Sequence, residues 1–157
     1  MISIRNVITG WKPVVLKEII QHDLETTPLF VKTANTGHMR VQFYSAGGEE
    51  AGLVAIKMPT PPTYRFGDCI SATSFPTTPP IKDETVWKIT KLPGPRMKLH
   101  CNGVEVLDML ITVETCTISS WREHWSRDVK RVKFITEDSS SKYYKIPPGN
   151  CNPALTS

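Results

Sequence analysis

The sequence predicts an all-β fold, an antiparallel two-sheet sandwich of the jelly-roll type, in a single domain over residues 1–157. Its 13 prolines outnumber its 9 glycines and cluster between apolar runs, which suits short strands joined by stiff loops rather than long helices. Roughly eight or nine segments have the alternation or β-branched content of strands, with turn residues between them. No segment is both long and clearly periodic at helical spacing.

The N-terminal part, residues 1–27, leaves two interpretations open. Its segment "KPVVLKEIIQHDLE" places apolar residues where a short amphipathic helix near the N-terminus needs them. The same β-branched residues fit a pair of strands equally well.

The strands expected after residue 27 are defined more clearly. They cover "PLFVKTA", "HMRVQFY", "GLVAIKM", "TYRFGDCISA", "VWKITKL", "MKLHC", "VEVLDMLITV", "VKRVKFITE" and "SKYYKI". In "HMRVQFY", Met39, Val41 and Phe43 point to one side and the polar residues to the other. The segment "CTISSWREHWSRD" is expected to be a loop or a single helical turn.

The tightest hairpin is expected at Asn102-Gly103, the preferred pair for a type I′ turn. A two-residue loop there places Cys101 opposite Val104 and Leu99 opposite Val106. The predicted buried face carries Met97, Leu99, Cys101, Val104 and Val106.

The four cysteines favour a disulfide framework. Their number is even and their spacing is wide, and the absence of any C-x-x-C argues against a structural zinc site. We expect the pairs Cys101–Cys116 and Cys69–Cys151, and with them a secreted, extracellular protein. The alternative is four buried, reduced thiols in a cytosolic protein.

The net charge of +4 is mildly basic, and the basic residues are spread out without a run of five. Nucleic acid is therefore not expected as a partner. The apolar runs are too short to span a membrane. The opening "MISIRNVITGW" lacks the basic start and long apolar core of a signal peptide, so secretion would need a leader outside this sequence.

The segment "SWREHWSRD" is the first candidate ligand site. It brings Trp121, His124, Trp125 and Arg127 within a short stretch. Exposed tryptophans stack on sugar faces, and Arg or His can fix a hydroxyl or carboxylate. The alternative is that Trp125 fills the core while the charged residues are solvated.

A row of basic side chains is the second candidate. Lys88, Lys98, Lys130 or Arg131, and Lys133 fall on outward positions of strands expected to be neighbours, where they would bind a sulfated glycan or another acidic partner. The alternative is an ordinary solvated sheet surface.

No catalytic signature appears, so we expect neither an enzyme nor a cofactor. No serine lies in a G-x-S-x-G, and no glycine loop is suited to phosphate. His100 and Glu105 are expected to lie opposite each other as a cross-strand polar pair rather than as a general base.

The stretch "VWKITKLPGPRMKLHCNGVEV" resembles the tryptophan–turn–NG hairpin of concanavalin-like sandwiches of the laminin-G, pentraxin and galectin types. The longer segment from Val86 to Tyr144 also resembles an uncharacterised invertebrate extracellular module. The resemblance implies a secreted two-sheet sandwich used for binding. The sequence lacks the galectin-type His-x-Asn-x-Arg with its downstream Trp-x-x-Glu, and it lacks a tight Asp/Asn cluster for calcium.

These observations lead to two functional hypotheses. The first is a non-enzymatic extracellular binding module that recognises a glycan or an extracellular protein. The second is a structural building block of an extracellular matrix, coat or filament, a homo-oligomer that assembles through its sheet edges.

Overall fold

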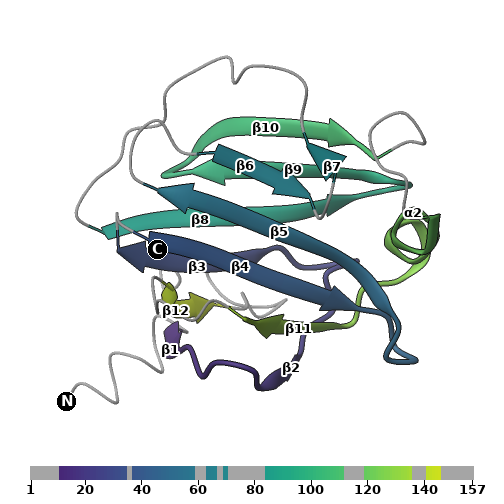
Figure 1. Ribbon diagram of the computed structural model, residues 1–157, viewed down its shortest axis with the longest axis horizontal. Coiled ribbons are helices and arrows are strands. Elements are labelled where there is room, and N and C mark those ends of the chain that lie inside the picture. Colours follow the sequence, from purple (N-terminus) through teal and green to yellow (C-terminus); the bar gives the residue numbers. More distant parts are fainter. Residues whose placement is uncertain are drawn as a thin grey trace.

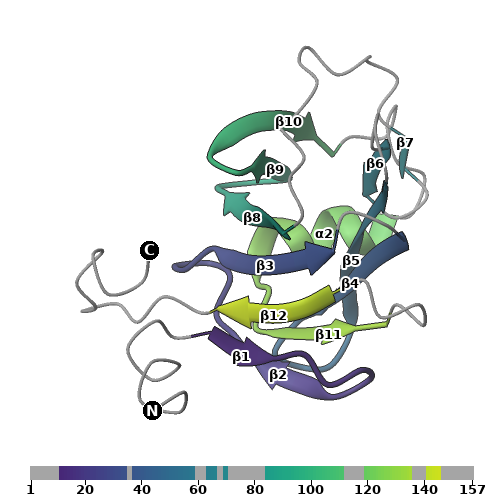
Figure 2. The same ribbon diagram turned by 90° about the vertical axis from the view of Figure 1, so that its left-hand side faces the viewer.

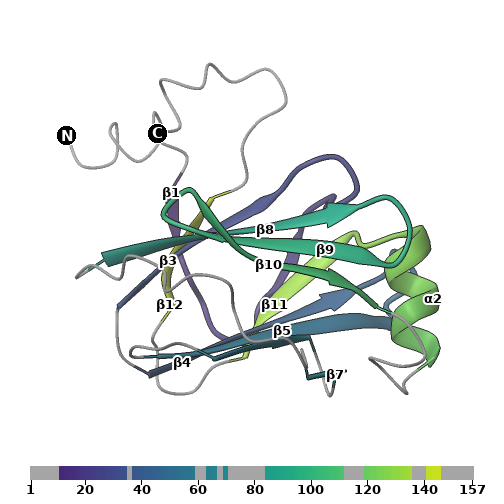
Figure 3. The ribbon, with the colours of Figure 1, turned by 90° about the horizontal axis from the view of Figure 1, so that it is seen from above.

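Two antiparallel six-stranded sheets packed face to face form the protein, as the all-β prediction required (Figures 1 to 3). This arrangement comes from a computed structural model that describes residues 11–34, 37–58, 63–66, 69–70, 84–111, 119–135 and 141–145. No helix in those ranges is long and apolar enough to cross a membrane.

We call the two sheets A and B. Sheet A has the strand order β1 (Trp11–Pro13), β12 (Ser141–Lys145), β3 (Leu29–Ala34), β8 (Glu84–Leu92), β9 (Arg96–Cys101) and β10 (Val104–Leu110). Sheet B has the order β2 (Ile19–Gln21), β11 (Arg131–Phe134), β4 (Gly37–Tyr44), β5 (Glu50–Met58), β6 (Thr63–Phe66) and β7 (Cys69–Ile70). Strands β4 to β7 therefore form a meander of sequence neighbours, whereas β11 joins it from the far end of the chain.

The open question about the N-terminal part is answered in favour of strands over residues 11–27, and residues 1–10 lie outside the described part. Strand β1 joins sheet A and β2 joins sheet B, with Lys17 at a positive φ of 66° between them. Val15 and Ile19 are exposed, whereas Val14 and Ile20 pack against the core. This distribution does not give the single continuous apolar face of an amphipathic helix.

A helix, α2 (Ser119–Arg127), replaces the expected loop and lies at one end of the sandwich, between the two sheets (Figure 3). Trp121 and Trp125 are four residues apart, so both lie on one side of the helix and enter the core. The prediction of a loop or single turn was wrong because it treated these tryptophans as a cluster rather than as a helical stripe.

The interior between the sheets is filled by large aromatic and aliphatic side chains. The ring of Phe66 makes edge-to-face contacts with Trp121 and Trp125, at centroid distances of 6.0 and 5.0 Å. On the sheet A side, Trp87 is fully buried and its indole N–H donates to Thr33 Oγ1 at 2.9 Å. The buried polar tip therefore has the partner that it needs.

The hairpin between β9 and β10 confirms the expected turn but not the whole register. Asn102 and Gly103 both have positive φ, 47° and 85°, and Val104 pairs with Cys101. A bulge between Glu105 and Leu107 then pairs Leu99 with Leu107 instead of Val106.

The extra residue of the bulge changes which side chains are buried. Val106 and Leu107 are both buried, and Met109 continues the inner face beyond them. Val104, expected inside, is 39% exposed at the end of the hairpin.

Cys101 is a free thiol that is fully buried, and burial raises its pKa to about 11. The predicted Cys101–Cys116 bond is thus not formed here, because the thiol lies inside the core as a small apolar group. Cys116, Cys151 and the side chain of Cys69 lie outside the described part of the chain, so the Cys69–Cys151 pair stays a prediction.

Candidate ligand-binding face

The two tryptophans of the first candidate site are not available to a ligand. Trp121 is 7% exposed and Trp125 is fully buried. The indole N–H of Trp125 donates to the backbone carbonyl of Arg96 at 3.1 Å, which ties α2 to sheet A. Stacking of these rings on a sugar is therefore excluded, and Trp125 fills the core as the alternative interpretation proposed.

The other two residues of the same candidate site, His124 and Arg127, each contact a protein carboxylate. His124 Nε2 contacts Glu49 Oε2 in the β4–β5 turn. Arg127 pairs with Glu123 one helical turn earlier at 2.6 Å, with both side chains largely exposed. The His124 contact joins the helix to the turn, whereas the Arg127 pair lies within the helix. The four residues do not form one ligand site.

The predicted row of basic residues is divided between the two sheets. Lys88 and Lys98 lie on neighbouring strands β8 and β9 of sheet A, whereas Lys133 lies on β11 of sheet B. Lys130 lies just before β11 and binds Asp23 Oδ1 at 2.9 Å. Strands β8 and β9 are neighbours as predicted, but β11 belongs to the other sheet, so Lys98 and Lys133 cannot serve one site.

Acidic partners neutralise part of the positive charge on the outer face of sheet A, where Lys32 and Lys88 lie over the rings of Trp11 and Phe30. Arg96 binds Asp108 through two hydrogen bonds, at 2.9 and 2.5 Å, and Lys98 pairs with Glu105 at 3.0 Å. Arg96 holds the pKa of the Asp108 carboxyl below its usual value. This half of the sheet A surface is a mixed, internally paired surface.

His100 lies in the same outer face, opposite Lys88 on one side and Glu105 on the other. Its Nε2 is 4.0 Å from Glu105 Oε1. Burial, and next the charge of Lys88, lower the pKa of His100. The arrangement is the expected cross-strand polar pair.

The outer face of sheet B is different, because its described strands carry more cations than carboxylates. They occupy four adjacent strands, β11, β4, β5 and β6, at positions that alternate with fully or nearly buried residues such as Val41 and Val132. On the described strands of this sheet, Glu50 is the carboxylate at an outward position, and it lies at the start of β5. We call the cationic set the basic face: Arg40, Lys57, Arg65, Arg131 and Lys133.

A small ordered group fixes one part of the basic face. The Lys133 ammonium lies 5.2 Å from the centroid of the Tyr44 ring, and the Tyr44 hydroxyl donates to Gln42 Oε1 at 2.6 Å. Lys133 and Gln42 are also paired in register across β11 and β4. The charge of Lys133 is therefore held over the sheet by its neighbours.

The centre of the basic face is a row that crosses three strands. Ala55 on β5 is paired with Arg40 on one side and with Arg65 on the other. Ala55 points outward but is only 3% exposed, and Leu53, two residues before it, is 8% exposed. Two arginines thus flank a short apolar side chain, with Lys57 following on the same strand.

Sequence reasoning found Lys133 and Arg131 but missed the other members of the basic face. Local alternation does place Arg40 and Lys57 on outward positions. What it lacks is the pairing of β11 with β4, which joins segments about ninety residues apart. Without that pairing, the cations of the two segments appear unrelated.

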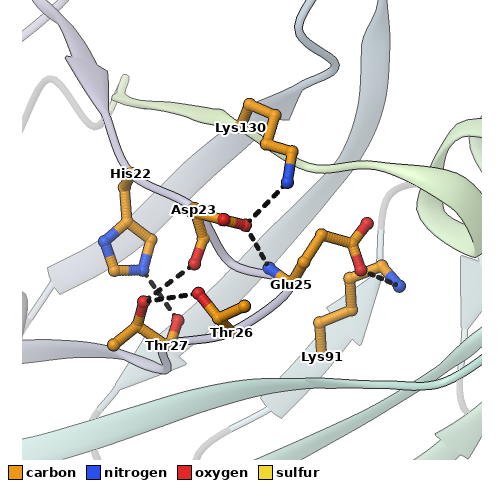
Figure 4. Close-up of polar contacts among 7 residues, drawn as sticks. All are labelled: His22, Asp23, Glu25, Thr26, Thr27, Lys91 and Lys130. Atoms are coloured by element: carbon orange, nitrogen blue, oxygen red, sulfur yellow. Dashed lines mark hydrogen bonds and ion pairs between the residues drawn. The ribbon is translucent and has the colours of Figure 1, made fainter. Parts of the chain in front are cut away.

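A second polar cluster ties the connection between β2 and β3 to the rest of the sandwich (Figure 4). Lys91, whose side chain is 2% exposed, pairs with Glu25 at 3.1 Å. Asp23 accepts from Lys130 and from the backbone N–H of Glu25, and the bond from Lys130 lowers the pKa of Asp23. His22 donates from Nε2 to the carbonyl of Thr27 at 2.9 Å.

These contacts run within the connection or from it to β8 and to the segment before β11. They hold the chain in place, whereas His22 Nδ1 and Glu25 Oε1 are buried without a hydrogen-bond partner. Within the described ranges, no group of three or more His, Cys, Asp or Glu side chains is placed to hold a metal ion.

No family model and no curated protein matches this chain. Among solved structures, the chain is similar to a tetrameric galectin from the ball sponge Cinachyrella sp., with a TM-score of 0.48 and 11% sequence identity over 83% of this chain and 95% of that one. Galectins are among the sandwich types that the sequence resembles, whereas the resemblance to an invertebrate extracellular module stays an expectation. A likeness this distant assigns no ligand, so the function is argued from the chain's own residues.

Proposed function

We propose that the protein is a non-enzymatic, extracellular binding module whose basic face contacts the ligand, a glycan or a glycan-bearing extracellular protein. The observation that supports this is the contrast between the two outer surfaces. The cations of sheet B lack neighbouring carboxylates on the described strands apart from Glu50, whereas Arg96 and Lys98 on sheet A are paired with acids. An excess of positive charge on one face attracts and orients a partner of opposite charge.

The spacing of the basic face favours binding over catalysis. Outward side chains of a sheet stand about 7 Å apart along a strand and about 4.8 Å apart across strands. Catalytic groups must instead converge within hydrogen-bond reach of one reacting atom. Side chains spread in this way suit several separate contacts with an extended partner.

The test compares two variants that each remove two lysine charges. Lys57→Gln/Lys133→Gln alters the basic face, and Lys88→Gln/Lys98→Gln is the control on sheet A. The control is closely matched, because Lys88 lies over Phe30 at 5.8 Å much as Lys133 lies over Tyr44. Both are applied with the wild type to a glycan array and to immobilised extracellular-matrix extract.

We expect the basic-face variant to lose most of the binding and the control to retain it. If both variants lost binding equally, the net charge of the protein would determine binding, and not the position of the charges on the basic face. If the wild type bound neither to the glycan array nor to the matrix extract, the binding-module hypothesis would be refuted.

The second candidate is the self-associating building block, and strand β10 favours it. This seven-residue strand lies at one edge of sheet A and carries the exposed apolar residues Val104 and Leu110, at 39% and 54%. An edge strand of this kind can add a strand from a second copy. Glu105 and Asp108 and the bulge oppose such pairing, so this candidate ranks second.

A further inference from the structure

We infer that the ligand of the basic face is a linear polyanionic polysaccharide, held across the strands of sheet B by its sulfate and carboxylate groups rather than by stacking of its sugar rings. The inference rests on the proposed role of the basic face and specifies the chemistry of the partner. Three features support it: the extent of the charge, the engagement of the Tyr44 ring among the described outward positions, and the geometry of the arginines.

The positive charge extends over four adjacent strands, of which β4, β5 and β6 lie in front in Figure 1. Arg131 and Lys133 are on β11 at one side, and Arg65 is on β6 at the other. Three strand spacings of about 4.8 Å separate β11 from β6, so the charges span about 14 Å. A single sulfated monosaccharide cannot contact both sides, whereas a chain with an anion on each of several residues can.

The aromatic side chain among the described outward positions of these four strands is Tyr44. Lys133 occupies one face of its ring and Gln42 binds its hydroxyl. Neutral sugars and single-stranded nucleic acids both depend on rings that are free to stack. Duplex DNA is read by a helix or ribbon that enters a groove, which a broad sheet face does not provide. The basic face therefore fits a charged polysaccharide better than any of these ligands.

The arginines fit the anionic groups of such a chain. A guanidinium presents paired N–H donors that match the oxygens of a carboxylate or sulfate. Arg131 on β11 and Arg65 on β6 lie about three strand spacings apart. A chain that crosses the intervening strands β4 and β5 can present anions to both arginines.

The experiment uses size-defined heparin oligosaccharides as the sulfated probe and the same oligosaccharides after chemical desulfation as the matched control. Affinities of the full-length protein are measured by calorimetry at several salt concentrations. DNA oligonucleotides of equal charge serve as the competing polyanion. The two lysine double variants are measured in parallel, and their melting temperatures confirm that they fold.

We expect the sulfated chains to bind more tightly as they lengthen, and desulfation to weaken binding by at least about tenfold. Lys57→Gln/Lys133→Gln should weaken binding about tenfold and flatten the dependence of log K on log salt by about two units, by analogy with the loss of two phosphate contacts. Lys88→Gln/Lys98→Gln should change neither the affinity nor its dependence on salt.

Three results would overturn the inference. Equal binding of sulfated and desulfated chains, with Lys57→Gln/Lys133→Gln still weaker, would keep the basic face as the binding site but make its ligand a neutral glycan. Equal or tighter binding of DNA would make the ligand a nucleic acid. Wild-type affinity of the Lys57→Gln/Lys133→Gln variant for every probe would refute the proposed function itself.

Discussion

Gly52 lies on the inner side of β5, directly against the ring of Phe66. A Cβ at this position would lie 2.2 Å from Phe66 Cζ, and that ring is held between Trp121 and Trp125. Gly52→Ala is therefore expected to destabilise the protein by about 2–3 kcal/mol, the range of an overpacked core. Urea unfolding measures the change.

The matched control is Gly47→Ala in the exposed β4–β5 turn. A Cβ there meets nothing closer than 3.6 Å, so we expect a change within about 0.5 kcal/mol. If Gly52→Ala lowered the free energy of unfolding as little as Gly47→Ala, β5 would not be packed closely against Phe66.

His22 is 3% exposed, and its burial lowers the pKa of the imidazole, against smaller opposing effects of the Thr27 carbonyl and Asp23. The folded protein therefore binds fewer protons at His22 than the unfolded chain does. Stability should rise with pH until the unfolded-state pKa of about 6.5 is passed, and should fall on acidification below it. The slope from this one group stays below about 1.4 kcal/mol per pH unit.

Urea unfolding between pH 5 and 8 tests the role of His22 against His22→Gln, which keeps a donor for the Thr27 carbonyl. The variant should show a smaller loss of stability on acidification than the wild type. Identical pH profiles would mean that His22 is not the group responsible.

At the scale of the element, the connection between β2 and β3 depends on the buried pair of Lys91 and Glu25. Lys91→Met leaves the Glu25 carboxylate without its partner in a mostly buried place. We expect a loss of about 2–3 kcal/mol, below the 3–5 kcal/mol of a fully buried pair because the Glu25 side chain is 23% exposed.

Two controls distinguish the effect of breaking the buried pair from the effect of removing any charge. Lys91→Met/Glu25→Leu removes both charges and should recover most of the stability. Arg127→Met breaks the exposed pair with Glu123 on α2 and should cost about 0.5 kcal/mol or less. If the double variant were no more stable than Lys91→Met, an unpaired charge would not explain the loss.

Most strands could be predicted from the sequence because alternation is a local property, as in "HMRVQFY" and "VWKITKL". Helix α2 was missed, although the spacing of Trp121 and Trp125 carried its signal. The bulge after Glu105 could not be seen, because "VEVLDML" is apolar at Val106 and at Leu107 and so permits either register. Strands with strict alternation were therefore predictable, whereas the bulged register of β10 was not.

At the scale of the whole molecule, the basic face could not be predicted from the local sequence pattern. The net charge of +4 gives no information on how the cations and their acidic partners are distributed between the two sheets. That division depends on β11 joining β4 instead of lying beside β8 and β9. The candidate site therefore became visible only with the topology, whereas its individual residues were already recognisable as outward positions.

Self-association of the protein is expected to proceed through the edge strand β10. A concentration series by size-exclusion chromatography with light scattering should show a mass that rises with concentration if β10 pairs with a second copy. Leu110→Lys should suppress the rise, because it adds charge to that edge. Val15→Lys is the matched control, since Val15 has the same 54% exposure but lies between β1 and β2.

A wild-type monomer at every concentration would remove the building-block hypothesis and leave the binding module alone. A dimer abolished only by Leu110→Lys would instead join the two hypotheses. It would place two basic faces in one particle, and a long polyanion that reached both would bind far more tightly than a short one. The dependence of affinity on heparin length should then become shallower in Leu110→Lys and remain unchanged in Val15→Lys.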